Sequence, residues 1–188
     1  MAKALAAASI VTLKITLRDI KPPVWRRLLV PGKMTLGGLS EVILAAMGWH
    51  GGHLHAFDIG GEQYGDVGNT EEVANENRLT LNAIVKSGLS RFAYTYDFGD
   101  NWDHAVTIEK PKPIVADMFY PACIAGKRNC PPDDCGGPGG YEELLEILAD
   151  PKHPEHAEKV EWIGEDFDPE IFDIDSANAM LAAMFKPT

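Results

Sequence analysis

The chain has 188 residues, of which 45% are hydrophobic and 24% are charged, a composition that is ordinary for one globular domain. Its formal net charge of −11 disfavours direct binding to nucleic-acid phosphates and to anionic membrane surfaces, because proteins that bind them usually carry a basic patch. No apolar run approaches the roughly 18–20 residues that span a bilayer.

The N-terminal part predicts a strand, a second strand and a helix. The N-terminus has one lysine and a short apolar patch but not the succession of basic, apolar and cleavage regions of a secretory signal, so we expect a disordered leader over residues 1–10 and a cytoplasmic protein. Residues 11–20 alternate apolar and polar side chains, and residues 24–31 predict a strand that pairs back as a hairpin. Thr35 is the expected N-cap of a helix whose apolar residues recur at helical spacing as far as Gly48.

The middle of the chain predicts two further hairpins. Residues 53–65 contain a glycine pair at which a hairpin is expected to turn. Residues 67–78 are polar without a period and predict a loop, and residues 79–88 have room for one helical turn. Residues 91–98 and 102–110 predict another strand pair around a tight connection.

The last third changes in composition. Residues 111–140 are rich in proline, glycine and cysteine and predict an irregular connection, which at this length needs a function or a brace. Residues 141–186 predict helices, the first with an amphipathic stripe. We therefore expect one α+β domain over residues 11–188, with a sheet-rich core in residues 11–110. A hairpin, a helix and further strands predict a mixed sheet with a β-grasp-like core, followed by C-terminal helices.

The segment YDFGDNWDH, residues 96–104, contains three aspartates and a histidine between two strands. One interpretation is a braced turn in which an aspartate such as Asp97 or Asp100 holds a partly buried His104. The other is a polar pocket, edged by Trp102, that binds a ligand or a metal, because a carboxylate can orient an imidazole as a base or as a metal ligand. The letters DFG also occur in protein kinases, but no glycine-rich phosphate loop or catalytic loop precedes them here, which excludes that fold.

Two further groups of residues are candidate metal ligands. His53 and His55 share one face of a predicted strand, where they either chelate a metal or lie at the edge of the core. Cys123, Cys130 and Cys135 lie within thirteen residues. Three thiols with a histidine such as His104 would satisfy zinc, whereas free thiols or a disulfide are the alternatives. Cys135 precedes a predicted helix, which favours a thiolate, but Asp133 and Asp134 oppose it.

Three stretches together resemble the plasmid pRi ORF-three-like family, found on plasmids and as a passenger of insertion elements, some of whose members carry a resolvase label. They are residues 13–49, the pair 53–65 and 96–110, and residues 130–156. The resemblance runs from about Val11 to Phe185 and implies a compact α+β domain. The family-typical positions that match are Pro22, Trp25, His53, His55, Asp97, Gly99, Asp100, Trp102, His104, Cys130, Pro131, Pro132, Cys135, Gly136, Gly137 and Tyr141. The basic DNA-binding part that a resolvase needs is not apparent.

Two hypotheses for function follow. The first is a small accessory module whose acidic pocket, built from the 97–104 turn and the 130–137 loop, recognises a protein or a small ligand. The second is a metal-dependent hydrolase, with zinc as the expected metal. The candidate ligand-binding residues are Asp97, Asp100, Trp102, His104, His53, His55, Asp133 and Asp134, and the candidate metal ligands are Cys123, Cys130, Cys135 and His104. Asp97, Asp100 and His104 are the candidate catalytic residues.

Overall fold

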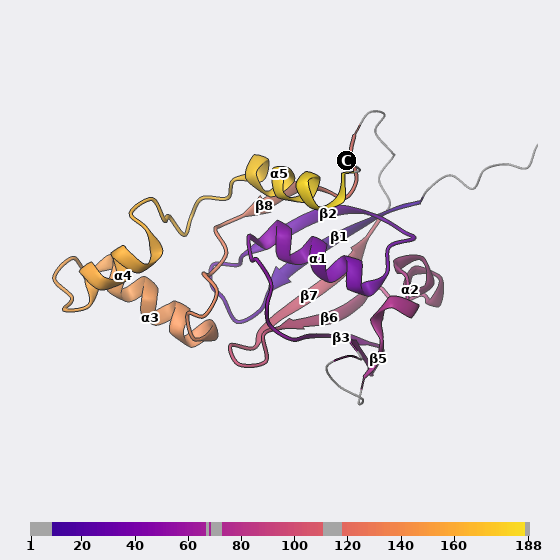
Figure 1. Ribbon diagram of the computed structural model, residues 1–188, viewed down its shortest axis with the longest axis horizontal. Helices are drawn as coiled ribbons and strands as arrows, with labels where there is room; N and C mark the ends of the chain where they lie inside the picture. Colours follow the sequence, from indigo (N-terminus) through magenta and orange to yellow (C-terminus); the bar gives the residue numbers. More distant parts are fainter. Residues whose placement is uncertain (1–8, 67, 69–72, 111–117, 187–188) are drawn as a thin grey trace, which may run out of the picture.

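The computed structural model describes residues 9–66, 68, 73–110 and 118–186. In this part of the chain, one eight-stranded sheet is accompanied by five α-helices (Figure 1). The strands are β1 (Ile10–Leu17), β2 (Trp25–Pro31), β3 (His55–Ile59), β4 (Glu62–Gly65), β5 (Ala74–Asn75), β6 (Arg91–Tyr96), β7 (Trp102–Glu109) and β8 (Ala122–Lys127). The helices are α1 (Leu36–Met47), α2 (Leu81–Ser87), α3 (Gly137–Ala149), α4 (His156–Ile163) and α5 (Ile174–Phe185), with a 3-10 turn η1 (Glu76–Arg78).

The strands are ordered β5-β4-β3-β6-β7-β1-β2-β8. All neighbours pair antiparallel except β4 and β5, which are parallel, so the sheet is mixed. The predicted α+β class, with hairpin, helix and further strands in that order and helices at the C-terminal end, is confirmed. No helix in the described ranges has both the length and the apolar character that a bilayer span requires.

The core forms between one face of the sheet and α1, which lies across that face (Figure 1). Leu13, Ile15 and Leu17 alternate along β1 and are buried, as the period-two pattern predicts. Helix α1 starts where the Thr35 side chain accepts a hydrogen bond from the amide of Gly38. The Ser40 hydroxyl, on the buried side of α1, lies 2.8 Å from the Tyr94 hydroxyl, so a polar contact fixes the helix on the apolar sheet.

The structure departs from the expected elements in the irregular connection of residues 111–140. Strand β8 lies within it and pairs with β2 at the edge of the sheet. Its sequence, ACIAGK, has no alternating pattern, so the pairing comes from the open edge of β2 rather than from β-propensity. The expected loop of residues 67–78 contains β5 and η1 among its described residues. The predicted leader falls mainly on residues outside the described ranges.

Three side chains of the YDFGDNWDH segment, those of Tyr96, Trp102 and His104, are fully buried in the core. Trp102 and His104 are fully buried on β7. The His104 Nδ1 atom lies 3.1 Å from the carbonyl oxygen of Tyr94. Because a carbonyl only accepts, Nδ1 carries the proton, and the buried Nε2 has no hydrogen-bond partner among the described residues. Burial lowers the pKa of His104 from 6.5 to about 4, so the imidazole is neutral near pH 7.

The depressed pKa of His104 predicts a loss of stability in mild acid. Above pH 6.5 both the folded and the unfolded chain hold this imidazole neutral. Between pH 6.5 and about 4 only the unfolded chain binds the proton, so the free energy of unfolding falls with decreasing pH. The contribution is at most roughly 3 kcal/mol. Urea unfolding at several pH values, with His104→Gln beside the wild type, should show a shallower acid dependence in the variant.

An NMR titration of the histidine side chains measures the pKa of His104 directly, without a substitution. We expect the His104 resonance to titrate well below the ordinary histidine value. A midpoint near pH 6.5 would mean that this imidazole is hydrated or paired with a carboxylate, and it would contradict a buried, neutral His104.

Candidate metal and ligand site

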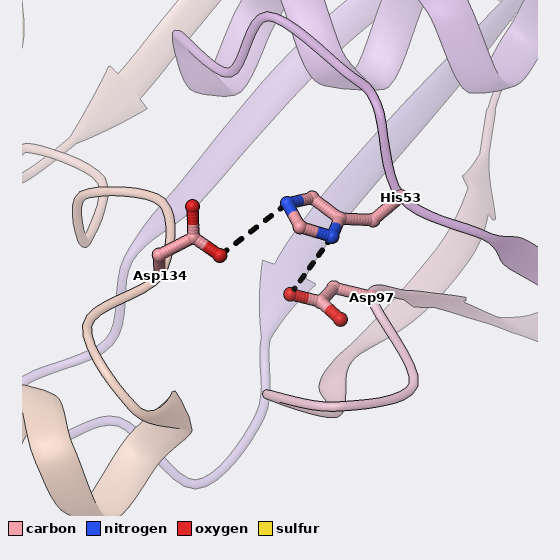
Figure 2. Close-up of side chains that lie close together, drawn as sticks. All are labelled: His53, Asp97 and Asp134. Atoms are coloured by element: carbon pink, nitrogen blue, oxygen red, sulfur yellow. Dashed lines mark ion pairs between the residues drawn. The ribbon is translucent and has the colours of Figure 1, made fainter.

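Three segments from distant parts of the sequence meet beside the end of the sheet. His53 precedes β3, Asp97 begins the turn between β6 and β7, and Asp134 lies in the loop before α3. Figure 2 shows the His53 ring between the two carboxylates. Its Nδ1 atom is 3.5 Å from Asp97 Oδ2, and its Nε2 atom is 3.5 Å from Asp134 Oδ1. One ligand atom from each side chain lies within 4.8 Å of the other two.

The backbone holds Asp97 in an unusual conformation. Its φ angle is 55°, in the left-handed region that aspartate tolerates because its side chain can bond locally. The carboxylate accepts a hydrogen bond of 2.9 Å from the amide of Gly99, which braces the turn. The Asp97 amide donates to the carbonyl oxygen of Leu54 at 2.8 Å, next to His53. The turn and the histidine loop are therefore fixed to each other through the backbone.

The third segment docks on the same turn through a very close backbone approach. The amide of Gly136 donates to Asp100 Oδ2 at 3.1 Å. Gly137 has a φ of 68°, and a Cβ atom added to it would lie 2.3 Å from the carbonyl oxygen of Asp100. Only glycine satisfies both the conformation and the space. Asp100 thus positions the loop that carries Asp134, rather than pointing its carboxylate at the imidazole.

Trp49 packs against two of the three segments, the loop before α3 and the end of β6, and sequence reasoning missed it. Its indole Nε1–H donates to the carbonyl oxygen of Pro131 at 2.9 Å. Its ring stacks on Tyr96 with centroids 5.1 Å apart, and it also contacts Trp102 and His104. One feature of the sequence could have marked Trp49. It lies between the end of α1 and the HGGHLH segment, where a large apolar side chain needs a buried position.

The phenol of Tyr96 and the carboxyl group of Asp133 lie next to the cluster of His53, Asp97 and Asp134. The Tyr96 ring meets the His53 ring edge-on, with centroids 5.7 Å apart. The buried Tyr96 hydroxyl has no hydrogen-bond partner among the described residues. Burial, with the charges of Asp133 and Asp97, raises its pKa to about 12, so it keeps its proton as a donor. Burial also raises the pKa of the Asp133 carboxyl, which lies close enough to His53 to interact with its charge.

Three of the other predicted ligand-binding residues, His55, Trp102 and His104, lie apart from this cluster. His55 is directed elsewhere on the sheet, where its Nε2 atom is 2.7 Å from Glu76 Oε2 and its ring contacts Phe57 and Tyr94. Trp102 and His104 are buried and pack against Trp49. They are not part of the group formed with the carboxylates of Asp97 and Asp134. The carboxylate–histidine pair that the sequence predicts for this turn is formed with His53 instead.

The three cysteines are free thiols. Cys123 and Cys130 are buried, and Cys135 is half-buried. Burial raises the pKa of all three thiols, and that of Cys135 reaches about 12, so each remains protonated at neutral pH. Among the described residues, the cluster of His53, Asp97 and Asp134 is the one group of three or more ligating side chains whose ligand atoms converge. Cys123, Cys130, Cys135 and His104 do not form such a group.

The approach of Gly137 to Asp100 predicts a sharp difference between two glycines of the same helix. Gly137→Ala should destabilise the protein by more than about 1 kcal/mol, because the new Cβ meets a carbonyl oxygen and the left-handed conformation is unfavourable. Gly139→Ala meets nothing within 4 Å and should be neutral or slightly stabilising. Thermal and urea unfolding of both variants measure this. Equal stabilities would contradict the docking of the loop on the turn.

Comparisons with known proteins agree with the resemblance seen in the sequence. The chain is 40% identical over 186 residues to the uncharacterized protein y4hQ of Sinorhizobium fredii, covering 95% of this chain and 90% of that one. It is 39% identical to the protein of unknown function MM3350 from Methanosarcina mazei Go1, whose crystal structure matches with a TM-score of 0.83 over 89% of this chain and 97% of that chain. A family model matches residues 9–176. The chain belongs to the family described as plasmid pRiA4b ORF-3-like protein.

Proposed function

We propose that this protein is a metal-dependent binding module that holds one divalent cation through His53, Asp97 and Asp134. The observation that carries the proposal is the convergence of these three side chains, from segments 44 and 37 residues apart, to within 4.8 Å of one another. Imidazole nitrogen and carboxylate oxygen suit zinc and other divalent first-row metals. The accessory-module hypothesis thereby gains a specific site.

The setting of the three side chains is compatible with a bound cation. Asp97 is largely buried, with its side chain 12% exposed, and a carboxylate in that position needs a compensating charge. Asp133 and Asp134 add negative charge from the facing loop. The Tyr96 hydroxyl supplies a buried donor that can bond to a metal-bound water or to an oxygen of a ligand.

A metal-dependent hydrolase is the second candidate. Three protein ligands leave at least one coordination position for water, as in catalytic zinc sites, whereas structural sites use four protein ligands. The Asp134 side chain is 74% exposed and also borders a groove between α3 and α4, so a ligand has access to the metal position. A metal-bound water in such a position would be an activated nucleophile. Our sequence-based candidates Asp100 and His104 do not take part in this version of the mechanism.

Metal content and calorimetric titration test the proposal. Untagged protein should bind about one equivalent of zinc or manganese. His53→Gln and Asp134→Asn should each weaken binding by roughly tenfold or more, because each removes a ligand. His153→Gln, at a histidine outside the cluster, is the matched control and should bind as the wild type does. Cys130→Ser should also retain the metal.

Two results would overturn the proposal. One is a wild-type protein that is folded by circular dichroism but takes up neither metal. The other is a metal that is lost in Cys130→Ser and retained in His53→Gln, because that outcome assigns the ion to the cysteine segment. Hydrolase activity is tested separately by screening ester, amide and phosphate substrates with metal-loaded protein, using Asp134→Asn as the inactive reference.

A further inference from the structure

A groove of about 470 Å³ opens between α3 and α4, beside the candidate metal site. The two helices lie together at one end of the molecule (Figure 1). Asp134, one of the proposed metal ligands, lines the groove as well. The remaining lining residues are Cys135, Gly140, Glu143, Leu144, Ile147, Glu155, Glu158, Lys159 and Trp162. The volume is within the range of roughly 300–1,000 Å³ that holds small ligands.

The groove combines an apolar base with acidic walls. Leu144 and Ile147 are buried side chains of α3 that form part of its lining. Carboxylates come from both sides, with Glu143 on α3 and Glu155 and Glu158 at α4, in addition to Asp134. Lys159 is the one cationic side chain among the described lining residues, so four carboxylates face one ammonium group. A ligand that complements this lining carries several positive charges on an apolar chain.

Trp162 is an independent sign that the groove takes a ligand of this kind. Its side chain lines the groove and is half exposed, although tryptophan is usually buried. An indole face is the aromatic surface that attracts organic cations most strongly. Methylene groups would pack on the ring and on the two aliphatic side chains, while ammonium groups would pair with the carboxylates. Aqueous metal ions or anions would use only part of this surface.

We propose that the groove binds a small linear polyamine, with ammonium groups held by the carboxylates of both helices and the chain packed against Trp162. The position of one end beside Asp134, within reach of a bound metal, rests on the proposed function. Recognition of the amine itself depends on the groove alone. This assigns the site a substrate class: an aliphatic amine, or a derivative modified at the nitrogen that reaches the metal.

Calorimetric titration with spermidine tests the proposal, performed on protein stripped of metal with a chelator and on metal-loaded protein. We expect one saturable site whose affinity falls as salt increases. Glu158→Gln and Trp162→Ala should each weaken binding by about 3- to 10-fold. The matched control is Glu146→Gln, an exposed carboxylate of α3 outside the groove, which should leave the affinity unchanged. Trp162→Phe should retain most of the affinity.

The arms of the experiment distinguish this inference from the metal proposal. Spermidine binding to a protein that takes up no metal would support the groove and remove the metal site. Metal binding without spermidine binding would overturn the groove proposal alone. An equal loss in Glu146→Gln and Glu158→Gln would also overturn it, because it means diffuse attraction to an acidic surface. Binding of a lysine-rich peptide without binding of spermidine would also overturn the groove proposal.

Discussion

The candidate site depends on one constraint, the docking of the loop before α3 onto the turn between β6 and β7. Gly137 lies so close to the backbone of Asp100 that no side chain fits, and Asp100 in turn accepts the amide of Gly136. The indole N–H of Trp49 also holds this loop by donating a hydrogen bond to the carbonyl oxygen of Pro131. This docking brings Asp134 to His53, because both residues lie in loops, outside the strands and helices. The precision of the site therefore comes from backbone contacts rather than from the side chains of His53, Asp97 and Asp134.

The YDFGDNWDH segment contributes residues both to the core and to the candidate site. Trp102 and His104 are buried and neutral, and they form the floor that carries Trp49. Asp97 and Asp100 are in the turn itself, where one carboxylate faces His53 and the other holds the neighbouring loop. Asp97 and Asp100 therefore brace the backbone of the turn, while a ligand site at Asp97 belongs to the proposed function. The acidic groove beside Asp134 extends the polar region onto α3 and α4.

Periodicity in the sequence was sufficient for most of the sheet and the helices, because buried strands and amphipathic helices leave a regular pattern. It missed β8, whose pairing is supplied by the edge of β2. One interpretation had an aspartate such as Asp97 or Asp100 holding His104, whereas His104 bonds to the carbonyl oxygen of Tyr94 and Asp97 faces His53. Both errors concern contacts between residues far apart in the chain, which no local pattern encodes. Trp49 was missed for the same reason, since its role depends on its contacts with Tyr96 and Pro131, which are distant in the sequence. The acidic groove could not be predicted from the sequence, because its carboxylates come together only when α3 packs against α4.

X-ray absorption spectroscopy of the zinc-loaded protein tests the central claim most directly, because it identifies the atoms bonded to the metal. A site formed by His53, Asp97 and Asp134 requires a first shell of nitrogen and oxygen at about 2.0–2.2 Å, with imidazole scattering and no sulfur. The spectrum should lose its imidazole signature in His53→Gln. Sulfur scattering at about 2.3 Å would instead place the metal on the cysteines and contradict a site built from these three side chains.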